Sequence, residues 1–214
     1  MSLVRELEEK RVAERRQLME AMAAYLRSQH IENELIDEPG TSVFGSPITE
    51  TAIQLKNSKI NTIRLISNDY MTCGVSGSVS RFQYQIISSK QLGSDSVKHL
   101  SAKTKTVKDK KVLGLFGGDI VNLKWVGNGL ASQLNTDSEI AGMLVKCAKS
   151  WENVEFQIQS KPPEVIEIYG PSFSDMARIQ KLYDTGQKNT VENCVFGFKI
   201  CDRIAIHIID LINR

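Results

Sequence analysis

The sequence has few cysteines, and their spacing does not indicate a metal site or a redox pair. None of the four forms the Cys-x-x-Cys pair that zinc ribbons and redox enzymes use. They are Cys73, Cys147, Cys194 and Cys201. No cysteine or second histidine lies four residues away from any of the three histidines. We therefore expect buried free thiols, no metal, no cofactor, and a reducing cytoplasmic environment.

Long hydrophobic runs are also missing. The longest apolar stretch, 204–212, is interrupted by His207 and Asp210 and is much shorter than the ~20 residues that span a bilayer. The residues after Met1 are largely charged, whereas a signal peptide needs an apolar segment there. We expect neither a membrane segment nor export.

Signatures of the common enzyme classes are absent as well. The sequence lacks the Ser-containing nucleophile elbow, the phosphate-binding loop, the dinucleotide-binding glycine motif and the His-Glu-x-x-His zinc motif. The 27 Lys and Arg residues nearly balance the 25 Asp and Glu, giving a net charge of +2. So small an excess does not by itself indicate nucleic acid or an anionic membrane as the partner.

The first 36 residues predict one long helix. Residues 3–29 are strong helix formers without glycine or proline. Leu18, Met22 and Leu26 form an apolar stripe at helical spacing, whereas residues 8–17 are polar on nearly all sides. The helix is interpreted either as a solvated helix that docks by its second half or as a dimerisation arm.

An antiparallel meander is predicted over residues 48–88. The turn-forming runs 37–40 and 45–47 precede it, and Ile53 with Leu55, and Phe82 with Tyr84, then alternate with polar residues. Further turns are predicted at residues 57–58, 67–69 and 74–77. The apolar half of the first helix is expected to cover one face of this sheet.

Residues 89–111 lose this periodicity and are predicted to form a Lys-rich loop. Its candidate ligand-binding residues are Lys103, Lys105, Lys108 and Lys110. Such lysines could neutralise phosphates and bind nucleic acid without sequence preference. No aromatic residue lies between Lys90 and Lys111 to stack on a base, and a solvated linker is the alternative.

Residues 112–214 predict a mixed second half that belongs to one domain with the meander. Strands are expected at 112–116 and 121–125, and as a hairpin around Pro162 and Pro163. The sequence from Thr136 to Glu139 matches a capping box, with Thr136 as the capping residue of the following helix. Another helix is expected after Pro171, with Ser172 or Ser174 as its cap.

A C-terminal helix completes the predicted α+β fold. Apolar residues recur at helical spacing from Val191 to Ile212. This stripe is expected to pack along the first helix, or along that helix from a second subunit, so that the chain ends would meet.

Single candidate residues remain for a site. Asp119, Glu167 and Tyr169 are candidate catalytic residues at strand ends. Residues 127–129, Gly-Asn-Gly, resemble a phosphate-binding turn in placement, although a plain turn is the simpler interpretation. His207 is expected to form a surface ion pair with Asp210.

Three functional hypotheses follow from these patterns. The first is a non-catalytic binding or assembly protein that acts as a homo-oligomer joined through its terminal helices. The second is an enzyme on an atypical α+β scaffold. The third is a nucleic-acid-binding protein that uses the Lys-rich loop.

Overall fold

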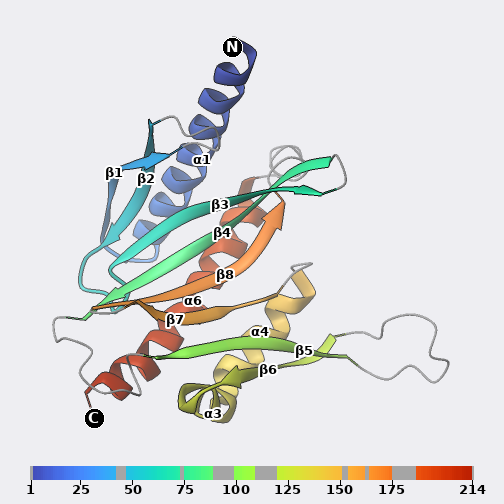
Figure 1. Cartoon of the computed structure of the whole chain (residues 1–214). Helices are drawn as coiled ribbons and strands as arrows, with labels where there is room; N and C mark the ends of the chain where they lie inside the picture. Colours follow the sequence, from blue (N-terminus) through green and yellow to red (C-terminus); the bar gives the residue numbers. More distant parts are fainter. Residues whose placement is uncertain are drawn as a thin grey trace.

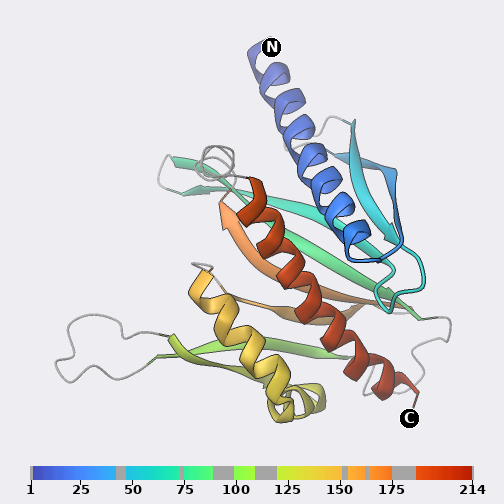
Figure 2. The same ribbon diagram turned by 180° about the vertical axis from the view of Figure 1, so that it is seen from behind.

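A single antiparallel sheet of eight strands runs through the molecule, with the order β1-β2-β3-β4-β8-β7-β5-β6 (Figure 1). The computed structural model describes residues 2–41, 47–72, 75–88, 99–108, 120–150, 154–161, 164–174 and 187–213. Helices lie on one face of the sheet, as the reverse view in Figure 2 shows. The predicted α+β class is therefore confirmed.

The first half of the chain contains a long helix and four sequential strands. They are α1 (Ser2–Ser28), β1 (Asn33–Thr41), β2 (Pro47–Leu55), β3 (Thr62–Thr72) and β4 (Val75–Ile87). The antiparallel meander is thus confirmed, and so is the long helix as far as Ser28, whereas residues 33–36, which we placed in the helix, begin β1. Residues 67–69, which we predicted as a turn, instead continue β3. Gly77, which we placed in the turn at 74–77, belongs to β4 and pairs with Tyr70 of β3. Polar composition alone does not end a strand, because the pairing uses backbone groups.

The predicted turn at residues 37–40 is also wrong, because these residues belong to β1. Asp37 pairs with Thr51, and Pro39 pairs with Thr49. A proline has no N–H to give to a sheet, but β1 is an edge strand, where one side of the backbone needs no partner strand. Of the predicted turn at 45–47, Pro47 begins β2, and the other two residues lie outside the described ranges.

In the second half, the described residues form four strands and three further helices. They are β5 (Ser101–Lys108), β6 (Ile120–Gly127), α3 (Gly129–Thr136), α4 (Ser138–Ser150), β7 (Gln157–Lys161), β8 (Val165–Ser174) and α6 (Gln187–Ile212). The strand at 121–125, the hairpin on either side of Pro162 and Pro163, and the C-terminal helix are confirmed. The strand at 112–116 was predicted for residues that the structure does not describe.

The predicted Lys-rich loop is wrong for residues 101–108, which form β5. Ala102 and Thr104 are buried, whereas Lys103 and Lys105 are exposed, so the period of a strand is present. Alanine and threonine are weakly apolar, and the alternation was therefore missed in the sequence. β5 pairs with β6 on one side and with β7 on the other.

β8 also extends further than predicted. It passes through Gly170 and Pro171 and ends at Ser174, and Ser172 pairs with Arg81 of β4. Ser172 therefore does not cap a helix. The rest of that predicted helix, residues 175–186, lies outside the described ranges.

The helical layer places α6 between α1 and α4 (Figure 2). Phe198, Cys201, Ala205 and Ile208 of α6 are all buried, and the ring of Phe198 lies 6.3 Å from that of Tyr84 on β4. The stripe on α6 is therefore covered within its own chain. The start of α1 and the end of α6 lie at opposite ends of the molecule, so the expectation that the termini meet is wrong (Figure 1).

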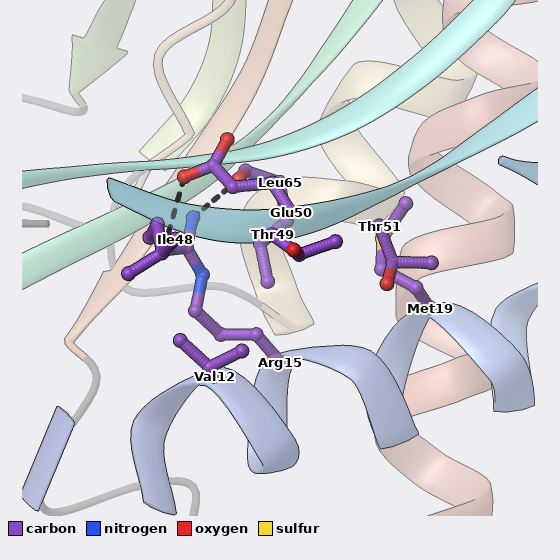
Figure 3. A pocket seen from close by; sticks show the side chains of 8 residues that line it. All are labelled: Val12, Arg15, Met19, Ile48, Thr49, Glu50, Thr51 and Leu65. Atoms are coloured by element: carbon purple, nitrogen blue, oxygen red, sulfur yellow. Dashed lines mark hydrogen bonds and ion pairs between the residues drawn. The ribbon is translucent and has the colours of Figure 1, made fainter. Parts of the chain in front are cut away.

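The polar half of α1 also contacts the sheet. Arg15 donates a hydrogen bond to the Leu65 carbonyl and lies 3.6 Å from a carboxylate oxygen of Glu50 (Figure 3). Val12 and Met19 flank it, and the space left beside them is about 10 Å³, enough for about one water. Docking therefore begins before Leu18, earlier along the helix than the apolar stripe predicts.

The helix α4 is confirmed, but its cap is Asp137 rather than Thr136. Asp137 Oδ1 accepts hydrogen bonds from the Glu139 and Ile140 amides at 2.9 and 3.0 Å. Its other oxygen, Oδ2, lies 3.0 Å from Arg203 Nε and 2.8 Å from His207 Nε2, both on α6. His207 is therefore paired with Asp137 instead of Asp210. One carboxylate joins two helices.

Candidate functional site

The sheet face opposite the helices carries mostly polar side chains. Figure 1 views this face, and no helix of the described part of the chain crosses it. In the pairing register, Gln85 of β4, Glu167 of β8 and Gln159 of β7 are direct neighbours. The next row along the strands contains Gln83, Tyr169, Gln157 and, on β5, Lys103. Directly paired residues share a face, so these side chains define what we call the polar face.

Glu167 is the centre of this face, and only 3% of its side chain is exposed. Oε2 accepts hydrogen bonds from Tyr169 Oη and from Gln159 Nε2, and it lies 2.9 Å from Lys161 Nζ. Oε1 accepts from Gln85 Nε2 at 3.2 Å. Both carboxylate oxygens are therefore occupied by partners from β8 itself and from its two neighbours, β4 and β7.

The electrostatics of this cluster keep Glu167 ionised. Burial raises the pKa of Glu167, but hydrogen bonds from Tyr169, Lys161 and Gln159 outweigh burial and leave its pKa below the ordinary value. Burial, together with the neighbouring Glu167, raises the pKa of Tyr169. A general acid or base works best with a pKa near the working pH, and these shifts lead away from neutrality.

These contacts favour a structural role for both predicted catalytic residues in the described region. Glu167 and Tyr169 lie two residues apart on β8 and hydrogen-bond to each other, and each is saturated by partners within the chain. Asp119, the third candidate, lies outside the described residues. Catalysis at Glu167 and Tyr169 stays a prediction.

The polar network continues from Glu167 towards β1. Gln85 contacts Arg64 of β3, which in turn pairs with Glu38 of β1. Next to it, the Arg81 guanidinium stacks 4.4 Å from the centre of the Tyr169 ring, and its buried Nε has no hydrogen-bond partner. Positive and negative groups thus alternate on this part of the face.

The opposite end of the polar face is basic. Lys103 and Lys105 of β5 and Lys124 of β6 are exposed, and Lys105 is directly opposite Lys124. Among the described residues no ion pair links these three lysines to a carboxylate, and neighbouring Lys161 is already paired with Glu167. Glu155, exposed just before β7, makes no ion pair with them either. We call Lys103, Lys105 and Lys124 the lysine patch.

The lysine patch differs from the predicted set of ligand-binding lysines. Lys103 and Lys105 belong to it, but Lys108 ends β5 with a side chain that is not described, and Lys110 lies outside the described residues. Lys124 was missed because it is far from the others in sequence. The alternation of Leu123, Lys124 and Trp125 was the available signal, and it required knowledge that β6 pairs with β5.

The turn at residues 127–129 has a role within the fold. The Asn128 N–H donates to the Ser101 carbonyl at 3.1 Å, and its side chain donates to the His99 carbonyl at 2.8 Å. The turn therefore fastens the start of α3 to the start of β5. These contacts support the plain-turn interpretation over a phosphate-binding turn.

Other site types find no support in the described ranges. No three side chains from His, Cys, Asp and Glu converge there as metal ligands. In the same residues, no helix has a stretch both long and apolar enough to cross a bilayer. Comparison with protein-family models, with curated proteins and with solved structures finds no match to this chain.

Proposed function

We propose that this protein is a non-catalytic binding protein that holds the phosphate backbone of a nucleic acid against the lysine patch. The observation that carries the proposal is the direct opposition of Lys105 and Lys124 beside Lys103, without a carboxylate partner. Like charges placed directly across two strands destabilise a sheet. A bound polyanion would remove that repulsion.

The character of the face favours binding without sequence preference. Phosphate contacts from lysines position a nucleic acid but do not read its bases. The Tyr169 ring is buried beneath Arg81 and offers no open surface for a base to stack on. The free, buried thiols of Cys147 and Cys201 agree with a location in the reducing cytoplasm, which we retain as part of the proposal.

The double variant Lys105→Glu/Lys124→Glu should weaken binding to labelled oligonucleotides at least tenfold in fluorescence anisotropy. It should also reduce the slope of log affinity against log salt by about 1.4 for single strands and about 1.8 for duplexes, because two phosphate contacts are lost. Lys124→Glu alone creates an opposite-charge pair with Lys105, so it should weaken binding without lowering the free energy of unfolding.

The matched control is Lys10→Glu/Lys199→Glu, which reverses two exposed lysines on α1 and α6. It should leave both affinity and salt slope nearly unchanged. Absence of oligonucleotide binding by the wild-type protein, or an equal loss in the control, would contradict the proposal. Polyglutamate binding that is tighter than nucleic-acid binding and is lost in the double variant would reassign the patch to an acidic polypeptide.

Homo-oligomerisation is a second candidate function, and the first turns of α1 favour it. They extend beyond the edge of the sheet, where Glu6, Glu9 and Lys10 are exposed (Figure 1). Light scattering should give a dimer mass for the full chain and a monomer mass for a chain that begins at Lys10. That shorter chain keeps the contacts of Arg15 with β2 and β3. A monomeric full chain would rule out this role for α1.

A further inference from the structure

A cleft of about 640 Å³ opens where α1 ends, on the helical side of the molecule. Its walls are the segment after α1, the turn between β2 and β3, and α6. The volume lies within the range of about 300 to 1,000 Å³ that is usual for small-molecule sites. The cleft is separate from the lysine patch, which lies on the other face of the sheet.

The walls of the cleft are fixed by contacts within the chain. The Lys56 amide donates to the Glu32 carbonyl at 2.9 Å, and Lys56 Nζ lies 2.8 Å from Glu34 Oε2. His30 and Asn57, one in each of the two segments that line the cleft opposite α6, both adopt left-handed backbone conformations, with φ of 61° and 56°. A cleft held in this way needs little reorganisation to accept a ligand.

Among the charged residues that line the cleft, Asp202 and Lys59 carry opposite charges and do not contact each other. Asp202 of α6 is partly buried, and burial raises its pKa above the ordinary value. The nearby positive charge of Lys59 opposes this rise without cancelling it. Lys59 and Asp202 are nevertheless not within ion-pair distance, and within the described part of the chain neither has another partner. A partly buried carboxylate without a partner lowers the stability of the fold. A ligand group placed between the two charges would relieve this cost.

The rest of the lining supplies apolar surface. Phe198 and Ile209 lie on the same side of α6 as Asp202, and Ile31 borders the cleft from the segment after α1. Pockets for small molecules combine such apolar walls with a few polar groups that fix orientation.

We propose that this cleft binds a zwitterionic small molecule with an apolar substituent, namely an α-amino acid with an aliphatic or aromatic side chain. The ammonium group pairs with Asp202, the carboxylate pairs with Lys59, and the side chain packs against Phe198 and Ile209. A simple anion would meet the charge of Asp202, and a simple amine would meet that of Lys59. Only a ligand with both charges satisfies both groups.

Calorimetric titration with L-leucine and L-phenylalanine tests the proposal, with isoamylamine and isovalerate as single-charge probes. The amino acids should bind at least tenfold more tightly than either single-charge probe. Asp202→Asn and Lys59→Gln should each weaken leucine binding at least tenfold. The control Lys199→Gln, on the exposed side of α6, should not change it.

Asp202→Asn removes an unpaired, partly buried charge, so this variant should unfold at the same denaturant concentration as the wild type or a higher one. A loss of leucine binding in this variant would then result from the missing charge in the cleft and not from unfolding. Absence of heat from both amino acids at millimolar concentrations would overturn the proposal, as would equal binding of isoamylamine or unchanged affinity in both variants. Lys124→Glu should leave leucine binding intact, which separates this site from the lysine patch.

Discussion

The variant Asp137→Ala should lower the free energy of unfolding by about 2 to 3 kcal/mol, because it removes a helix cap, an ion pair with Arg203 and a hydrogen bond with His207 together. The Asp137 side chain is only 6% exposed and accepts from two amides of α4 as well as from Arg203 and His207. Losing the cap alone typically costs about 1 kcal/mol. Arg203 and His207 are partly exposed and regain water, which limits the cost of losing their contacts with Asp137. Urea denaturation at neutral pH measures the total.

Two neighbouring substitutions separate the contributions. Asp137→Asn keeps an oxygen that can cap α4 but loses the charge, so its cost should be about half that of Asp137→Ala. Thr136→Ala should cost less than about 0.5 kcal/mol, since the Thr136 hydroxyl only donates to the Gln133 carbonyl within α3. If Thr136→Ala proved as costly as Asp137→Ala, Thr136 would be the cap that the sequence pattern suggested.

The effect of Asp137 should also depend on pH. Burial raises the pKa of Asp137, but hydrogen bonds from His207, the Ile140 amide and Arg203 outweigh burial and lower it from 3.8 to about 2. A carboxyl with a depressed pKa stabilises the folded state above its unfolded pKa, and this contribution is lost as pH falls through the folded pKa. The stability difference between wild type and Asp137→Asn should therefore be constant above about pH 4 and shrink between about pH 4 and pH 2. A constant difference down to pH 2 would contradict this assignment.

The choice of cap illustrates what local sequence can and cannot predict. Thr136 and Asp137 are consecutive residues of types that cap helices, so the pattern places the start of α4 to within one residue. The choice between them depends on Arg203 and His207, which are far away in the chain and reach the cap only because α6 packs against α4. By contrast, α1 and α6 could be predicted from local sequence alone. Their apolar residues recur at helical spacing, and burial of one helix face suffices to define them.

The strands and the site show the same division. β2 and β4 were predicted from large apolar residues such as Ile53 and Tyr84, whereas β5 buries only Ala102 and Thr104 between its lysines. The pairing of Glu167 with Lys161 and Gln159 follows from the β7–β8 hairpin and was within reach of the sequence. The lysine patch was not, because the opposition of Lys105 and Lys124 requires the register between β5 and β6. The cleft at Asp202 was also out of reach of the sequence, because three separate segments of the chain enclose it.

Gly127→Ala should destabilise the fold by about 3 kcal/mol or more, because the position combines a positive φ with a close backbone approach. The backbone of Gly127 has a φ of 151°, which a residue with a side chain rarely adopts. A Cβ atom added there would lie 2.2 Å from the Ser101 carbonyl oxygen and 2.8 Å from the Ala102 Cα. Both are backbone atoms of β5, which pairs with β6 and cannot withdraw without breaking the sheet at that point.

Two other glycines provide matched controls for Gly127→Ala. Added Cβ atoms at Gly129, the first residue of α3, and at Gly142, inside α4, would meet no atom within 4 Å. Gly142→Ala should raise the free energy of unfolding by about 0.5 to 1 kcal/mol, since alanine is the better helix former, and Gly129→Ala should change it little. Chemical denaturation of the three variants at neutral pH makes the comparison. If Gly127→Ala were as stable as Gly129→Ala, residues 127–129 would not be held against β5, and the phosphate-binding interpretation of this turn would have to be reopened. A large loss of stability in Gly127→Ala alone would show that glycine is needed at this position because two strands approach closely there. No ligand would then be required to explain it.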